Sequence, residues 1–169
     1  DLEKKQTMFV AEGKGSQTIE SFVADLEAHN GVSEQVEQVT CDMSPAFIKG
    51  VEENLVNAKI TFDKFHVIKI VNEAVDKVRK EEQKTNPILK QSRFIFLKNR
   101  KNLTTKQAEQ LVEISMRKAN LKTYKAMQIR ESLQQIYNTG NNKTAFAEFL
   151  KKWYFWATHC RIEPIIKVA

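Results

Sequence analysis

The chain has 169 residues, of which 41% are hydrophobic and 28% are charged. This composition is typical of a soluble globular domain with its own core and excludes a disordered chain. No apolar run approaches the roughly 18 residues of a membrane-spanning helix, so we expect no membrane partner and a cytoplasmic location. The two cysteines, Cys41 and Cys160, lack the spacing of a zinc site, and we expect both to be reduced.

The net charge of +6 conceals an uneven distribution along the chain. Residues 1–66 carry 6 basic and 12 acidic side chains, whereas residues 67–169 carry 21 basic and 9 acidic ones. The first part is therefore acidic and the second is strongly basic, with a net charge of +12. A basic surface of this size is typical of nucleic-acid binding, but a solvated, lysine-rich helical surface explains the charge equally well.

The first part of the chain alternates predicted strands with predicted helices. Short runs rich in β-branched and apolar residues predict strands over residues 6–12, 36–42 and 58–63. Apolar residues at helical spacing predict a helix after each strand: from Thr18 to a stop at Asn30-Gly31, from Ser44-Pro45 onward, and over residues 62–80. This order favours an at least partly parallel sheet covered by helices, in which chemistry gathers at the carboxyl ends of the strands.

The helix predicted over residues 62–80 is amphipathic. Val67, Val71, Ala74 and Val78 form its apolar stripe, and Ile70 and Val75 lie beside it. On the other face three pairs have the spacing of i,i+4 ion pairs: Lys69–Glu73, Glu73–Lys77 and Asp76–Lys80.

The second part of the chain is predicted to be all-helical. Thr104 and Gln107 have the spacing of a capping box, and further helices are expected over residues 121–137 and from Thr144 onward. Only residues 93–97, RFIFL, could form another strand. We therefore expect a mixed α/β (α+β) region over residues 1–85 and a basic, all-helical region over residues 86–169.

Asp42 is the first residue that could carry chemistry. It follows the predicted strand 36–42 and precedes the helix start at Ser44-Pro45. A carboxylate in this position can hold a divalent cation such as Mg²⁺, which prefers carboxylate oxygens. Spacing alone favours a simpler role, in which Asp42 caps a turn.

Asp63 and His66 are the second candidate, a D-x-x-H pair in the first turn of the helix over residues 62–80. Asp63 can cap backbone N–H groups and also accept a hydrogen bond from the imidazole. A carboxylate there orients the His66 ring and raises its basicity. A structural cap beside a satisfied histidine is the alternative, and spacing alone favours it.

The third candidate is an aromatic cluster formed by Trp153, Tyr154, Phe155 and Trp156. With the basic residues Lys151, Lys152 and Arg161 nearby, these rings could stack on nucleobases. The spacing of Trp153 and Trp156 continues the stripe of Phe146 and Phe149, which favours a place for both in the core.

Residues 39–82, VTCDMSPAFIKGVEENLVNAKITFDKFHVIKIVNEAVDKVRKEE, resemble the core of bacterial insertion-sequence transposases of the ISL-three type. The opening DLEKKQTMFVAEGKG, the stretch RFIFLKNRKNLT and the late WYFWATHC fit the same family. The resemblance implies a DDE-type domain with an RNase H-like core. Such domains hold Mg²⁺ (or Mn²⁺) with two Asp and one Glu, and they cleave DNA and carry out strand transfer.

The resemblance also implies roles for individual residues. Asp42 matches the second Asp of the triad and is the expected catalytic metal ligand, while Asp63 and His66 resemble a supporting motif. The first Asp is expected before Asp1 and the Glu beyond Ala169. The chain would then be an internal piece that is inactive by itself and does not hold the metal stably.

The family further implies partners and an arrangement of the regions. The expected partners are DNA, both transposon ends and target, and further copies of the protein in a homo-oligomeric assembly within the bacterial cytoplasm. Residues 86–169 would be a helical insertion in the partial RNase H-like core. The competing hypothesis is a non-enzymatic nucleic-acid-binding module on a degraded RNase H-like scaffold, in which Asp42 has no catalytic use.

Overall fold

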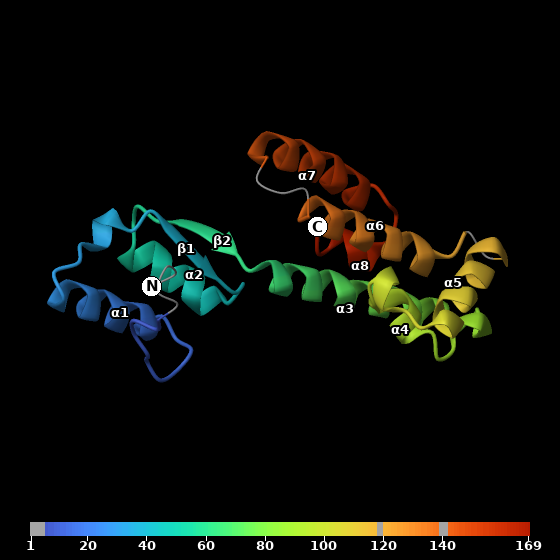
Figure 1. Cartoon of the computed structure of the whole chain (residues 1–169), viewed down its shortest axis with the longest axis horizontal. Coiled ribbons are helices and arrows are strands. Elements are labelled where there is room, and N and C mark those ends of the chain that lie inside the picture. The colour runs from blue at the N-terminus through green and yellow to red at the C-terminus, as the bar shows by residue number, and fades with distance from the viewer. Residues whose placement is uncertain (1–5, 118–119, 139–141) are drawn as a thin grey trace. The chain divides into compact units, whose positions relative to one another are not determined.

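The computed structural model describes residues 6–117, 120–138 and 142–169 (Figure 1). The chain forms two compact units, Asp1–Val67 and Ile68–Ala169. The boundary between them falls inside one continuous helix, α3 (Lys64–Glu82). No helix within the described ranges is long and apolar enough to cross a membrane.

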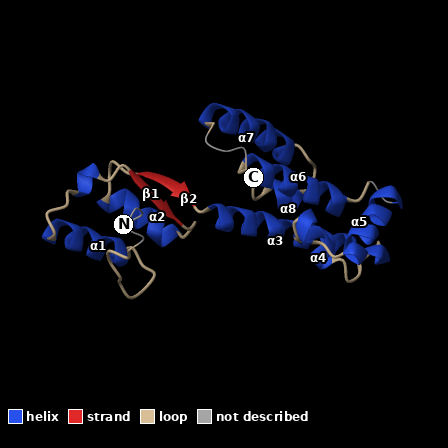
Figure 2. Ribbon diagram, in the orientation of Figure 1, coloured by secondary structure: helices blue, strands red, loops and turns tan. Residues whose placement is uncertain are grey.

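The first unit contains a small parallel sheet, drawn in red in Figure 2. Its strands β1 (Gln38–Cys41) and β2 (Lys59–Phe62) pair so that Gln38 lies opposite Lys59 and Cys41 lies opposite Phe62. Helix α2 (Pro45–Asn54) links the strands and packs on β1, and α1 (Gln17–Ala28) packs on α2. A short 3-10 turn, η1 (Ser33–Gln35), precedes β1. The parallel pair with its crossover helix confirms the predicted βαβ order in this region.

Local sequence signals explain how α1 and α2 begin, end and pack. After α1, Asn30 adopts a positive φ of 61° and the N–H of Gly31 donates to the Leu26 carbonyl at 2.8 Å, so the predicted stop is confirmed. Helix α2 starts with Pro45, whose missing N–H is not needed at that position. At Gly50, a Cβ atom would lie only 2.9 Å from Ile19, so the glycine permits the close contact between α2 and α1.

The strand predicted over residues 6–12 is wrong. Residues 6–11 have no regular secondary structure, and no third strand within the described ranges joins the sheet. Met8 and Val10 are exposed, while the Phe9 ring packs edge-on against Phe22 with centroids 5.8 Å apart. An apolar run becomes a strand only where its backbone pairs with a neighbouring strand, and residues 6–11 pair with neither β1 nor β2.

The second unit is helical. Beyond α3 it contains η2 (Pro87–Leu89), α4 (Arg93–Leu97), η3 (Arg100–Asn102), α5 (Thr105–Arg117), α6 (Lys122–Ile136), α7 (Lys143–Thr158) and α8 (Glu163–Ile166). Helices α6 and α7 lie side by side, and α4 contacts both α5 and α6 (Figure 1). The capping box is confirmed, because the Gln107 side chain accepts the Thr104 N–H at 3.2 Å and the Thr104 hydroxyl accepts the Gln107 N–H at 3.3 Å.

The possible strand over residues 93–97 is corrected to the one-turn helix α4. Two consecutive side chains, Ile95 and Phe96, are buried, while Phe94 is exposed. This pattern does not fit a strand, in which successive side chains point to opposite faces. It fits a helical turn that inserts two neighbouring residues into the core.

The core of the second unit forms around α3 and α6. The predicted α3 stripe is confirmed at Val71, Ala74 and Val78. Deeply buried residues of α6 are Ala126, Met127, Ile129 and Leu133. The mixed α+β class is confirmed for a mostly helical chain with a two-stranded parallel sheet.

Glu82, the last residue of α3, caps the start of α6 from outside that helix. Its carboxylate accepts the backbone N–H of Lys122 at 2.9 Å, and both the N–H and the hydroxyl of Thr123 at 2.8 Å. The first N–H groups of a helix lack intrahelical partners, and a carboxylate also suits the positive end of the helix dipole. Glu82 therefore fixes the end of α3 to the start of α6.

Replacing Glu82 by Ala is expected to lower the free energy of unfolding by about 1–2 kcal/mol, the usual effect of losing a helix cap. Urea unfolding followed by tryptophan fluorescence measures this in the second unit, because both tryptophans lie there. Glu81→Ala, at the exposed neighbouring position, is the matched control. Equal stability of the two variants would show that the cap contributes nothing.

Candidate active site

Asp42 and Asp63 lie at the same edge of the sheet. Each follows the last residue of its strand, and those last residues, Cys41 and Phe62, are paired. The backbone N–H of Asp63 donates to the Cys41 carbonyl at 3.0 Å, so the hydrogen bonding between the two strands continues as far as Asp63. The structure therefore brings the two predicted acids to the carboxyl edge of one strand pair, where ligands of open parallel sheets bind.

Asp42 uses one carboxylate oxygen in a local turn. Its Oδ1 accepts the backbone N–H of Ser44 at 3.0 Å and so shapes the entry into α2. The side chain is half-buried, and no hydrogen bond from the described part of the chain reaches Oδ2. The turn cap is thus real, and it leaves the second oxygen open to a ligand.

The neighbouring thiol of Cys41 is held in its neutral form. Burial, and then the negative charge of Asp42, raise the pKa of Cys41. Both cysteines of the chain are free.

Asp63 and His66 form the predicted pair. Nδ1 of His66 lies 3.1 Å from Oδ2 of Asp63, and the backbone N–H of Phe65 donates to Oδ1 at 2.8 Å. The pKa of Asp63 is lowered, first by this backbone hydrogen bond and further by His66. Asp63 is therefore a firmly ionised acceptor that orients the ring of a partly exposed histidine.

Three exposed apolar side chains adjoin these acids in the sequence and are not among the predicted site residues. Met43 follows Asp42, Phe62 ends β2, and Phe65 lies between Asp63 and His66 with 80% of its surface exposed. Phe65 falls outside the apolar stripe of α3, which is the signal that could have identified it.

The two predicted acids do not form a complete metal centre within the described residues. The described ranges contain no group of three or more His, Cys, Asp or Glu side chains that could hold a metal ion. Asp42, with one free oxygen at a strand end, has the chemistry of a Mg²⁺ ligand. It fits such an ion as one ligand of a larger set.

The basic residues of the second unit are not all available to a partner. Arg79 and Arg130 are buried. Arg130 donates to the carbonyls of Leu97 and Lys98 at 2.6 and 3.2 Å and so satisfies the end of α4. Part of the +12 charge therefore has a structural role, and the exposed lysines carry most of the remainder.

The aromatic cluster divides between core and surface. Trp153 is buried, and its indole N–H donates to the Ile129 carbonyl at 2.8 Å, so its expected core position is confirmed. Trp156 is only half-buried, while Tyr154 and Phe155 are exposed.

The described chain thus joins a parallel βαβ unit, in which an acid follows each strand, to a basic helical unit. The whole chain, residues 1–169, matches the family model of transposases of the DDE, ISL-three type. The chain belongs to this family of transposases.

Two curated relatives with similar sequences are also transposases. The chain is 27% identical to the transposase for insertion sequence element IS1001 of Bordetella parapertussis, over 79% of this chain and 34% of that protein. It is 24% identical to the transposase for insertion sequence element IS1557 of Mycobacterium tuberculosis, over 100% of this chain and 43% of that protein. The chain thus spans less than half the length of these relatives. No solved structure matches it significantly.

Proposed function

We propose that this chain is part of the catalytic core of a DNA transposase that cleaves DNA and carries out strand transfer with the help of a divalent metal. The main support for the proposal is the position of Asp42 at the end of a strand. One oxygen of its carboxylate accepts a hydrogen bond in a turn, and the other oxygen is free to bind a ligand. Family membership supports the reaction class. Asp42 is the proposed catalytic metal ligand, and the core it belongs to is RNase H-like.

Bound Mg²⁺ or Mn²⁺ would activate the attacking oxygen and stabilise the leaving oxygen of the phosphodiester. The residues of this chain contribute position and charge. Asp42 presents Oδ2 to the metal, while the turn bond to Ser44 fixes the carboxylate. Asp63 holds His66 at the same sheet edge, where the imidazole supports the site or contacts DNA.

The proposed partners are transposon ends and target DNA, in a homo-oligomeric assembly. The proposed catalytic region covers residues 1–85, and the proposed helical region begins at residue 86. Exposed lysines of the helical region would neutralise DNA phosphates, and this neutralisation supplies most of the non-specific affinity for DNA. No residue of β1 or β2 is buried, although parallel sheets are normally covered on both faces. This exposure supports a sheet that is completed within a larger protein.

A cleavage and joining assay on transposon-end DNA in Mg²⁺ tests the proposal. We expect activity from the full-length transposase that carries this segment and none from the 169-residue chain, because one carboxylate cannot position the metal. Strand transfer by the chain alone would contradict its proposed incompleteness. Inactive full-length protein that still binds the DNA would favour a non-enzymatic nucleic-acid-binding module.

A further inference from the structure

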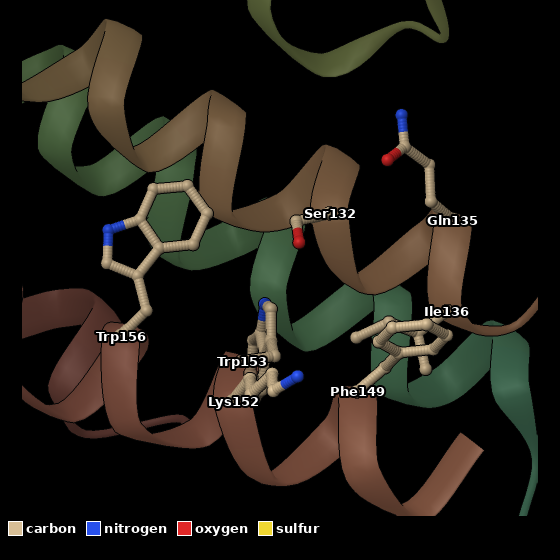
Figure 3. Close-up of a pocket in the computed structure, with 7 residues that line it drawn as sticks. All are labelled: Ser132, Gln135, Ile136, Phe149, Lys152, Trp153 and Trp156. Carbon is tan, nitrogen blue, oxygen red and sulfur yellow. The ribbon is translucent and has the colours of Figure 1, made fainter. Parts of the chain in front are cut away.

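An open groove lies between α6 and α7, with a volume of about 330 Å³. Trp156 and Phe149 lie toward its two ends on α7, and Trp153 forms part of its floor (Figure 3). Ser132 and Gln135 line it from α6, and the Ser132 hydroxyl points toward α7 (Figure 3). The groove therefore combines aromatic surfaces with a few polar groups, as small-ligand sites do.

Trp156 differs from Trp153 in its exposure and in its hydrogen bonding. The N–H of Trp153 is satisfied by Ile129, whereas the indole of Trp156 makes no hydrogen bond within the described part of the chain. Trp156 is also only half-buried. Trp156 therefore presents part of its ring face and an indole N–H that has no protein partner among the described residues.

The groove has little net charge of its own, and its basic surroundings favour an anionic ligand over a cationic one. Its one charged lining residue is Lys152, whose Nζ pairs with Glu148 at 2.7 Å on the exposed surface of α7. Lys151 adjoins it in a unit whose net charge is strongly positive. An apolar peptide helix would meet Lys152, Ser132 and Gln135 in this groove and leave their polar groups desolvated.

We propose that this groove binds an unpaired nucleobase of DNA, stacked on Trp156. The hydroxyl of Ser132, which points toward α7 (Figure 3), can donate and accept hydrogen bonds at the base edge. Lys152 would bind an attached phosphate in place of its present partner Glu148. Base–aromatic stacking is tolerant of sequence because every base has a flat face. The inference rests on the proposed function, since it requires a DNA partner.

The test uses the 169-residue chain and two DNA hairpins that differ in one nucleotide. In one hairpin a 2-aminopurine is unpaired, and in the other it is paired with thymine. We expect the unpaired hairpin to bind about tenfold more tightly, in line with the stacking of one base, and its 2-aminopurine fluorescence to be quenched. Trp156→Ala should abolish both effects, whereas Trp156→Phe should retain much of them.

Two further variants control for loss of structure. Phe155→Ala removes an exposed aromatic ring from α7 outside the groove and should leave the preference unchanged. Ser132→Leu fills the groove from α6 without removing a core side chain, so it should abolish the preference even where Trp156→Ala fails to fold.

The outcomes separate this inference from the proposed function. Equal affinity for the two hairpins would overturn the nucleobase site and leave the transposase proposal standing. Failure to bind either hairpin would overturn both the site and the DNA-contacting role of this chain. An oligomer that dissociates in Trp156→Ala with an unchanged preference for the unpaired hairpin would show that the groove binds protein, which also overturns the inference.

Discussion

Replacing Asp42 by Asn in the full-length transposase is expected to lower DNA cleavage and joining by roughly 100-fold or more. A catalytic metal supplies several kcal/mol of transition-state stabilisation, and each 1.36 kcal/mol corresponds to a factor of ten in rate. The substitution separates the charge of Asp42 from its structural role, because the Asn side-chain oxygen can still accept the Ser44 N–H that Asp42 accepts at 3.0 Å. The turn is kept, and the negative charge that would hold the metal is lost.

Cleavage and joining of end DNA in Mg²⁺, together with DNA affinity, measure this effect. DNA affinity should be unchanged in Asp42→Asn, because that affinity depends on basic side chains that contact phosphates and Asp42 is an acid. The matched control is Asp63→Asn at the neighbouring strand end, where we expect a smaller loss, since Asp63 is engaged with Phe65 and His66. Undiminished joining by Asp42→Asn would refute its role as a metal ligand.

Much of the candidate site could be predicted, because it depends on local signals and on one general rule. The two short β-rich runs and the Ser44-Pro45 helix start fix a βαβ unit, and the carboxyl ends of parallel strands meet at one edge. This places Asp42 beside Asp63 without any knowledge of side-chain packing. The D-x-x-H spacing likewise predicts the contact between Asp63 and His66, found at 3.1 Å.

The errors fall where partners distant in sequence decide the structure. The apolar run at residues 6–12 is strand-like, but in the described chain it joins neither strand of the sheet. The Glu82 cap joins residues 40 and 41 positions apart. Arg130 reaches carbonyls 32 and 33 positions away. The hydrophobic periodicity of the sequence does not predict such contacts, because they depend on how the helices pack.

The charged face of α3 shows the same limit at short range. Three i,i+4 pairs have suitable spacing, but of these only Asp76–Lys80 forms an ion pair in the described chain, at 3.1 Å. Asp76 is buried and also binds Arg79 at 2.8 Å and Arg93 of α4 at 3.6 Å. Sequence spacing predicts that an ion pair can form, whereas burial decides which ion pair contributes to the stability of the fold.

Replacing Asp76 by Asn is therefore expected to lower the free energy of unfolding by about 3 kcal/mol, because it leaves the buried Arg79 guanidinium without its counter-charge. Urea unfolding at pH 7, followed by tryptophan fluorescence, measures the loss in the second unit. Glu73→Gln is the matched control on the same helix. Glu73 is exposed and forms neither of its predicted pairs with Lys69 and Lys77, so its loss should change stability by less than about 0.5 kcal/mol.

The effect of Asp76→Asn should also depend on pH in a defined direction. Burial by itself raises the pKa of Asp76, but hydrogen bonds from Lys80 and Arg79 together hold that pKa below its usual value. A carboxyl whose pKa is lower in the folded state stabilises the fold above its unfolded pKa of about 3.9 and loses that contribution as the pH falls. The stability difference between wild type and Asp76→Asn should thus be largest near neutral pH and shrink below about pH 4. A difference that grows on acidification would show that the ionised carboxylate is not what stabilises Arg79.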